Sequence, residues 1–133
     1  MPMIRIVIDA NVWIRFARSK NIQPLRSRLI KYQMVPVANN YLLLEIFDAL
    51  VDNGWMPLEQ AQNVVELVTA ICLIQTEHAI FRLSIDPEDN YLIDLATQYH
   101  CKYIISDDSM LARVPLLPIP VRSSNWFLET LPI

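Results

Sequence analysis

The sequence predicts one α/β domain with three layers, in which helices cover both faces of a central, mostly parallel sheet. Short β-branched segments alternate with helical segments along the chain, and this alternation is typical of a parallel sheet. The 133 residues suffice for one domain spanning 1–133 but not for two. The chain has a single glycine, which excludes the glycine-rich loops that bind dinucleotides or cradle phosphates.

The expected elements follow one another in a regular order. Segments with strand character are 3–8, 34–37, a stretch within 73–83, 102–105 and a short piece near Val121. Helical segments are expected at 11–18, 23–32, 40–53, 57–71, 87–99, 109–113 and 124–130. Gly54 is placed to end the third of these helices. The proline-rich run 115–120 breaks regular structure before the last strand and helix.

Composition favours a cytoplasmic protein that does not enter the membrane. Hydrophobic residues make up 53% of the chain and charged residues 19%, but no apolar run approaches the ~20 residues that cross a bilayer. The β-branched N-terminus does not resemble an export signal. Cys72 and Cys101 do not form a metal-binding motif, and buried reduced thiols are expected. Neither histidine lies in a recognisable nucleophile motif, so nucleophilic hydrolases are disfavoured.

Charge is distributed unevenly along the chain. Residues 1–32 carry seven basic residues and the single acid Asp9, whereas the remainder carries four basic residues and thirteen acids. A basic segment directly after an acidic site is what a polyanion such as RNA would contact. The alternative is an ordinary solvated helix face. The candidate RNA-binding residues are Arg15, Arg18, Lys20 and Arg26.

Two groups of polar residues directly follow predicted strands. Asp9 follows the first strand, and Ser106, Asp107 and Asp108 follow a later one. If the strands are parallel, both groups lie at the carboxyl edge of the sheet, where ligands bind in such folds. Each aspartate can instead cap the helix that comes next.

The tetrapeptide 86–89 is a strong helix start. Asp86 is suited to the N-cap, Pro87 to the first helical position and Asp89 to the third, as in a capping box. This interpretation explains the tetrapeptide without any function.

The helical projection adds a second interpretation for Asp89. At about 100° per residue, Asp89 lies on the same side as Leu92, Ile93 and Ala96, whereas Asp94 lies well away. A carboxylate that points toward the sheet needs a partner, because an unpaired buried charge is unfavourable. Backbone N–H groups, a basic side chain or a metal ion can each supply that partner.

Glu45 lies near Asp48 and Asp52 in the projection of its helix, as in a solvated acidic stripe. It also borders the apolar side at Leu42 and Ala49. The residues alone leave both interpretations open.

Four short motifs, taken in order, resemble those of the PIN domain family. They are the first acid with Asn11 two residues on, the helical acid Glu45, the acidic helix start at 86–89, and the turn from Ser106 to Asp108. The resemblance covers essentially the whole chain and implies a PIN-like three-layer fold. The turn departs from the family pattern, since Asp107 fills a slot often held by glycine and Met110 replaces a frequent acid.

Carried over to this chain, the resemblance implies a set of acidic metal ligands with supporting residues. The implied ligands are Asp9, Glu45, Asp89 and Asp108, and the implied supporting residues are Asn11, Asp86, Ser106 and Asp107. The spacing from Ser106 favours Asp108 over Asp107 as the fourth ligand. Such a carboxylate set suits Mg²⁺ or Mn²⁺.

The resemblance also implies a function. Proteins of this size in the family are commonly ribonuclease toxins of bacterial or archaeal type II toxin–antitoxin pairs, which act as homodimers and are silenced by an antitoxin protein. We therefore expect a metal-dependent endoribonuclease. The alternatives are an inactive PIN-like module that binds RNA or protein, and a receiver-like domain with a phosphoryl-accepting aspartate. A receiver-like domain would place a lysine at the end of a late strand, whereas Lys102 opens its strand.

Overall fold

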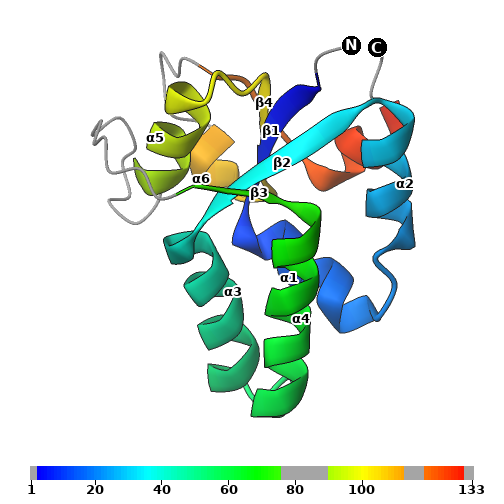
Figure 1. Cartoon of the computed structure of the whole chain (residues 1–133), viewed down its shortest axis with the longest axis vertical. Helices are drawn as coiled ribbons and strands as arrows, with labels where there is room; N and C mark the ends of the chain where they lie inside the picture. Colours follow the sequence, from blue (N-terminus) through cyan, green and yellow to red (C-terminus); the bar gives the residue numbers. More distant parts are fainter. Residues whose placement is uncertain (1–2, 76–89, 113–118, 131–133) are drawn as a thin grey trace.

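A computed structural model of the chain describes residues 3–75, 90–112 and 119–130. Its strands form one sheet in the order β3-β2-β1-β4-β5, and every neighbouring pair is parallel (Figure 1). The strands are β1 (Ile4–Ile8), β2 (Met34–Asn39), β3 (Leu73–Gln75), β4 (Tyr103–Ile105) and β5 (Val121–Arg122). The predicted α/β class with a parallel sheet is confirmed.

Helices cover both faces of this sheet. They are α1 (Ala10–Ser19), α2 (Gln23–Lys31), α3 (Asn40–Asp52), α4 (Leu58–Ile71), α5 (Asn90–Gln98), α6 (Ser109–Ala112) and the π-helical turn η2 (Trp126–Thr130). Parallel crossovers are right-handed, so the connections that step from β1 to β3 place α1–α4 on one face, and those that return to β4 and β5 place α5 and α6 on the other (Figure 1). In the described ranges, no helix is long and apolar enough to cross a bilayer.

The predicted boundaries hold to within a few residues, and the differences have long-range causes. β2 extends two residues beyond its predicted end, because Ala38 and Asn39 pair with Ile74 and Gln75 of β3. Residues 76–83 of the predicted third strand and residues 87–89 of the predicted helix lie outside the described residues.

The core forms around β1, whose Ile6, Val7 and Ile8 are fully buried. A parallel strand that is covered on both faces has consecutive apolar residues instead of an alternation, and the sequence of β1 has this pattern. Trp13 of α1 and Phe127 of the C-terminal helix, which spans 124–130 and includes η2, are the largest described side chains that are buried in the same core.

Gly54 ends α3 as predicted. Its φ of +67° is left-handed, its N–H donates to the Val51 carbonyl at 3.0 Å, and the Trp55 N–H donates to the Leu50 carbonyl at 3.1 Å. These two bonds form a Schellman motif, which satisfies the last carbonyls of the helix. The chain then reverses into α4, and α3 and α4 extend together away from the sheet (Figure 1).

Candidate active site

The sheet order creates a switch point at the carboxyl ends of β1 and β4. The chain first builds β1, β2 and β3 in one direction and then returns past β1 to build β4 and β5. In open α/β sheets, ligands bind where the strand order reverses in this way. Asp9 directly follows β1 and Ser106 directly follows β4, so both lie at this point.

Backbone pairing brings these two residues together. Ile8 is in register with Ile105, and the Asp9 N–H continues the ladder by donating to the Ile105 carbonyl at 2.8 Å. The Ser106 hydroxyl then donates to Oδ2 of Asp9 at 2.7 Å. Residues 97 positions apart in the sequence therefore share one short hydrogen bond.

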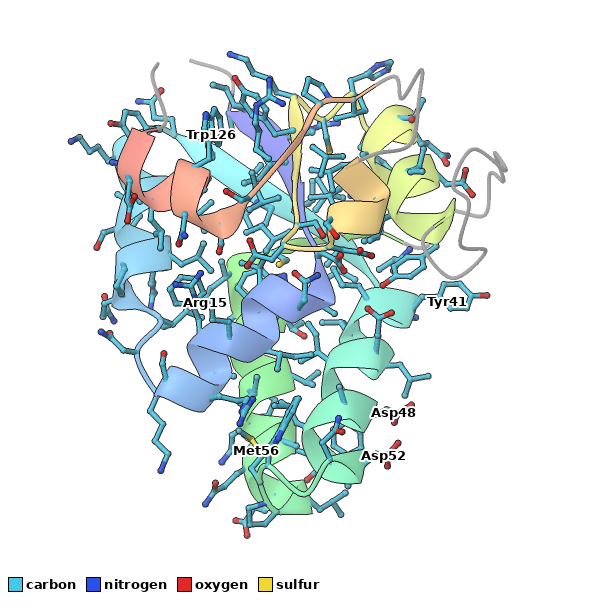
Figure 2. The ribbon with its side chains drawn as sticks, turned by 180° about the vertical axis from the view of Figure 1, so that it is seen from behind. Arg15, Tyr41, Asp48, Asp52, Met56 and Trp126 are labelled. Carbon is cyan, nitrogen blue, oxygen red and sulfur yellow. The ribbon has the colours of Figure 1, made fainter. Side chains whose placement is uncertain are left out.

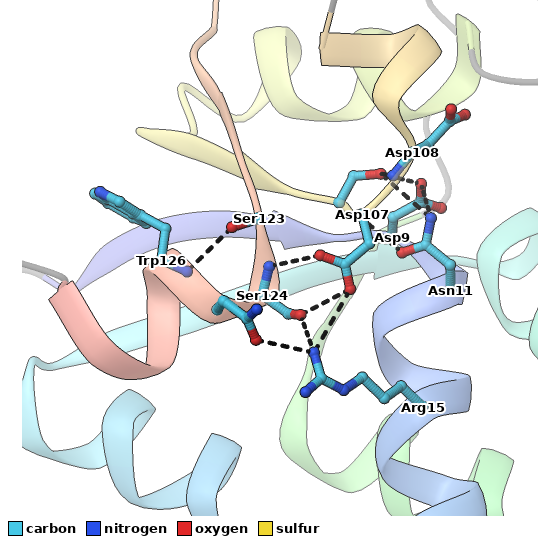
Figure 3. A network of polar contacts seen from close by, with 10 residues as sticks. Asp9, Asn11, Arg15, Asp107, Asp108, Ser123, Ser124 and Trp126 are labelled. Carbon is cyan, nitrogen blue, oxygen red and sulfur yellow. Dashed lines mark hydrogen bonds and ion pairs between the residues drawn. The ribbon is translucent and has the colours of Figure 1, made fainter.

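Asn11 and the turn after β4 complete a connected network (Figure 3). The Asn11 side-chain amide donates to Asp9 Oδ2 at 3.2 Å and to the Ser106 hydroxyl oxygen at 3.3 Å. Its carbonyl oxygen accepts from the Asp107 N–H at 3.2 Å, and the Ser106 hydroxyl oxygen accepts from the Asp108 N–H at 3.0 Å. Asn11 and Ser106 thus link the Asp9 carboxylate to the turn of Ser106–Asp108.

The Asp9 carboxylate is buried, and its surroundings disfavour the charged form. Burial raises its pKa above the ordinary value, the Ser106 hydroxyl and the Ala10 N–H lower it, and the charges of Asp108 and Asp107 raise it further. Asp9 is 5% exposed. It also caps α1 by accepting from the Ala10 N–H at 2.7 Å, so the capping interpretation is correct as well. In the described part of the chain, no basic side chain forms an ion pair with Asp9.

Asp107 and Asp108 point in different directions (Figure 3). The Asp107 carboxylate accepts from the Ser124 N–H at 2.8 Å and from the Ser124 hydroxyl at 2.7 Å. Arg15 Nη1 lies 3.9 Å from the same carboxylate. The Asp108 carboxylate is directed away from this group (Figure 3).

Glu45 is separated from the other acids of α3. It is half-buried, and its Oε2 accepts from the Tyr91 hydroxyl of α5 at 2.9 Å. Asp48 and Asp52 are exposed farther along the helix (Figure 2). The solvated stripe predicted as one option therefore describes Asp48 and Asp52 but not Glu45.

The family assignment agrees with this geometry. A family model described as PIN domain matches residues 5–110, a range that contains all four expected acids. The chain belongs to the PIN domain family. PIN domains are generally nucleases that use divalent metals, so membership indicates a nuclease. No curated protein matches the chain.

Two of the expected PIN residues, Asp86 and Asp89, lie outside the described residues. The helix that follows them has the predicted buried residues Leu92, Ile93 and Ala96. Asp94 is buried too, with 7% of its surface exposed, although the projection placed it away from the apolar side. The structure buries all of Leu92–Ala96, so a single-face projection was wrong for this helix.

Sequence reasoning missed two further residues at this edge. Tyr91, the partner of Glu45, belongs to no recognisable sequence motif. A hydrogen bond between two helices also produces no periodic pattern in the sequence. Asn39 ends β2, is buried, and caps α3 by accepting from the Leu42 N–H at 3.0 Å. An Asn before an apolar helical run is a recognisable N-cap, so Asn39 could have been found.

The expected RNA-binding residues are spread over two helices of the PIN domain. Arg15 lies on α1, about 9 Å along the helix axis from Asp9, and donates to Ser124 and Asn125. The guanidinium of Arg18 stacks on the Trp55 ring at 3.9 Å. Lys20 ends α1, and Arg26 is exposed on α2.

The residues at the switch point fit a hard divalent cation in chemical type. Carboxylate, hydroxyl and amide oxygens are the ligands that Mg²⁺ and Mn²⁺ prefer, and a cation would relieve the unfavourable charge on Asp9. Across the residues that the structure describes, however, no three acidic, histidine or cysteine side chains are grouped so as to hold an ion. Asp9 and the turn of Asp108 share Ser106, but Glu45 does not form a three-acid group with Asp9 and Asp108 in the described part of the chain.

Thiol chemistry is not available at neutral pH in this PIN domain. Cys72 and Cys101 are free, and burial raises the pKa of each thiol to about 12. The thiolate is the nucleophilic form, so neither cysteine competes with the carboxylates as the reactive group.

Proposed function

We propose that this PIN domain is a Mg²⁺- or Mn²⁺-dependent endoribonuclease. Its metal ligands would be Asp9, Glu45, Asp89 and Asp108. The observation that carries the proposal is the buried Asp9 carboxylate at the switch point, which has no cationic partner among the described residues and shares Ser106 with the turn of Asp108. A buried carboxylate in this situation favours binding of a cation.

The chain's own residues would orient the metal ligands. The Asp9 Oδ1 is held by the Ala10 N–H, and its Oδ2 by Ser106 and Asn11, which fixes the plane of the carboxylate. Hydrogen-bonded partners of this kind tune the affinity of metal ligands. When bound, the metal would lower the pKa of a water and neutralise charge on the phosphoryl oxygens during in-line attack.

The basic N-terminal segment supports RNA as the substrate. Residues 1–32 hold seven of the eleven basic residues of the chain, and Asp9 is the N-cap of α1. Phosphates drawn to Arg15, Arg18 or Lys20 would lie along α1, which leads to the site, and Arg26 would contact RNA from α2. Asp86 would be a peripheral acid.

We further propose that the protein is the toxin of a toxin–antitoxin pair and acts as a homodimer. Support comes from its size and family, and from large apolar side chains exposed on α3 and α4. These are Tyr41, Leu44, Leu58 and Leu67. Exposed apolar groups of this kind commonly mark protein interfaces.

A second candidate function is a PIN module that binds RNA or a protein without cleaving. The observation that favours it is the lack of a three-acid group within the described ranges. The two candidates differ in whether a metal ion is held at Asp9.

An RNA cleavage assay with Mn²⁺ separates these functions. We expect the parent protein to cleave single-stranded RNA, EDTA to abolish cleavage, and Asp9→Asn to lose more than about 100-fold, since even partners of metal ligands are worth 10- to 100-fold. Asp52→Asn, an exposed acid on α3, is the matched control and should retain parent activity. RNA binding without cleavage would favour the binding module, and equal cleavage by parent and Asp9→Asn would exclude the assigned site.

A further inference from the structure

The C-terminal helix contributes to the edge of the site although it lies beyond the family match. That match ends at residue 110, whereas the partner of the Asp107 carboxylate is Ser124, 17 residues along the chain. We propose that Asp107 is a positioning residue, whose carboxylate fastens the turn of Ser106–Asp108 to the start of the C-terminal helix and so holds Asp108 in place. This inference rests on the metal site of the proposed function.

The Asp107 carboxylate accepts two short hydrogen bonds from Ser124. Oδ1 accepts from the Ser124 N–H at 2.8 Å and Oδ2 from the Ser124 hydroxyl at 2.7 Å. Hydrogen bonds to a carboxylate in this range are stronger than neutral ones. Ser124 is 1% exposed, so loss of the carboxylate would leave a buried N–H without an acceptor, which is unfavourable.

The C-terminal helix is itself firmly placed. Ser123 caps it by accepting from the Trp126 N–H at 3.1 Å, and Phe127 is buried in the core. The Trp126 ring packs on Tyr103 of β4 with centroids 5.0 Å apart. Arg28 of α2 donates to the Phe127 carbonyl at 3.0 Å. Asp107 therefore connects its turn to a helix that contacts the core, β4 and α2.

Two backbone N–H groups also hold this turn, one by a bond to Asn11 and one by a bond within the turn to Ser106. Asp107 donates to Asn11 and Asp108 donates to Ser106. Asp107 points to the C-terminal helix, while Asp108 is directed away from it (Figure 3). The side chain of Asp107 thus fixes the backbone that carries Asp108. A glycine in this slot could not make the tie.

Arg15 adds a weaker contact to this tie. It donates to Ser124 and Asn125 and lies 3.9 Å from Asp107, with 51% and 35% of the two side chains exposed. Exposed pairs of this kind contribute little. The bonds of Ser124 are thus the main connection.

Titration with Mn²⁺ by isothermal calorimetry tests the role of Asp107. We expect Asp107→Ala to weaken Mn²⁺ binding by about 10- to 100-fold, as loss of a partner of a metal ligand does. Asp107→Asn keeps an oxygen that can accept from the Ser124 N–H, so it should restore most of the affinity. The control Asp48→Asn should bind as the parent does. Parent affinity in Asp107→Ala, or equal losses in the Ala and Asn variants, would overturn the proposal, the second outcome by making Asp107 a direct ligand.

Hydrogen exchange of the amides of Asp107 and Asp108, measured without metal, gives a readout independent of metal binding. We expect faster exchange in Asp107→Ala, and in Ser124→Ala should the first variant fail to fold. Unchanged exchange would overturn the tie. If the parent itself binds no Mn²⁺, the proposed function fails, and the exchange rates still decide whether Asp107 holds the turn.

Discussion

Two acidic regions of this PIN domain differ in every respect except residue type. At the switch point, Asp9 is buried and receives hydrogen bonds from Ala10, Asn11 and Ser106. On the outer face of α3, Asp48 and Asp52 are exposed (Figure 2). Water solvates the second pair, whereas the protein itself must stabilise the first carboxylate. The comparison teaches that an acid is a candidate for chemistry when its neighbours come from other elements.

The same contrast occurs within a single helix. Glu45 and Asp48 are one turn apart on α3, yet Glu45 accepts from Tyr91 of α5 and Asp48 is exposed. Two of the four predictions below compare such neighbours directly, Glu45 with Asp48 and Tyr91 with Tyr41.

The largest effect is expected from removing the charge of Glu45. If Glu45 is a metal ligand, Glu45→Gln should weaken Mn²⁺ binding by roughly 100-fold, the upper range for partners of metal ligands. Asp48→Asn, its neighbour on α3, should leave the affinity unchanged. Calorimetric titration measures both, and equal affinities would remove Glu45 from the site.

The second prediction concerns the pH dependence of stability at Asp9. Because the pKa of Asp9 is raised in the folded protein, the folded state binds more protons than the unfolded state above the ordinary value of 3.8. The metal-free parent therefore loses free energy of unfolding as the pH rises from the ordinary pKa of 3.8 to the raised pKa of Asp9 in the folded protein.

Asp9→Asn lacks that loss, so its stability relative to the parent should increase as the pH rises. Denaturant unfolding across about pH 3 to 7 measures the difference. Mn²⁺ should raise the melting temperature of the parent and not of the variant. A constant difference between the two proteins at all pH values would contradict the unfavourable charge on Asp9.

A smaller effect is expected when the partner of Glu45 is shortened. Tyr91→Phe removes the hydroxyl that donates to Glu45 and should reduce Mn²⁺ affinity about fivefold, since a hydrogen bond is worth about 1 kcal/mol. Tyr41→Phe is the control, because Tyr41 packs near Tyr91 at 6.2 Å between ring centroids and is exposed. Affinity losses of equal size in both variants would show that the hydrogen bond from Tyr91 to Glu45 is not what sets the affinity.

The smallest effect on the site is expected from the far end of α3. Gly54→Ala places a side chain at φ +67° with no atom within 4 Å of the new methyl group, so only backbone strain of about 1 kcal/mol should appear. Thermal unfolding should show this loss, whereas Mn²⁺ affinity should equal that of the parent. A change in affinity would mean that the helix end and the site are coupled.

The sequence could predict the elements and the places of the first acids because both are local properties. Consecutive β-branched residues mark a strand buried on both faces, as in β1, and a glycine after an apolar helix marks its end, as at Gly54. Once the strands are parallel, Asp9 and Ser106 must share an edge of the sheet. The fold class, the end of β1 and the edge that carries the acids were therefore contained in the sequence.

Tertiary structure alone decided which groups each acid contacts. Asp107 and Asp108 are adjacent and chemically alike, and only the position of Ser124 directs one of them to the C-terminal helix. The bond of Tyr91 to Glu45 and the burial of Asp94 likewise depend on which helices pack together. Periodicity in the sequence indicates on which face of its own helix or strand a residue lies. A hydrogen bond between two elements depends on distances that arise only when the chain is folded.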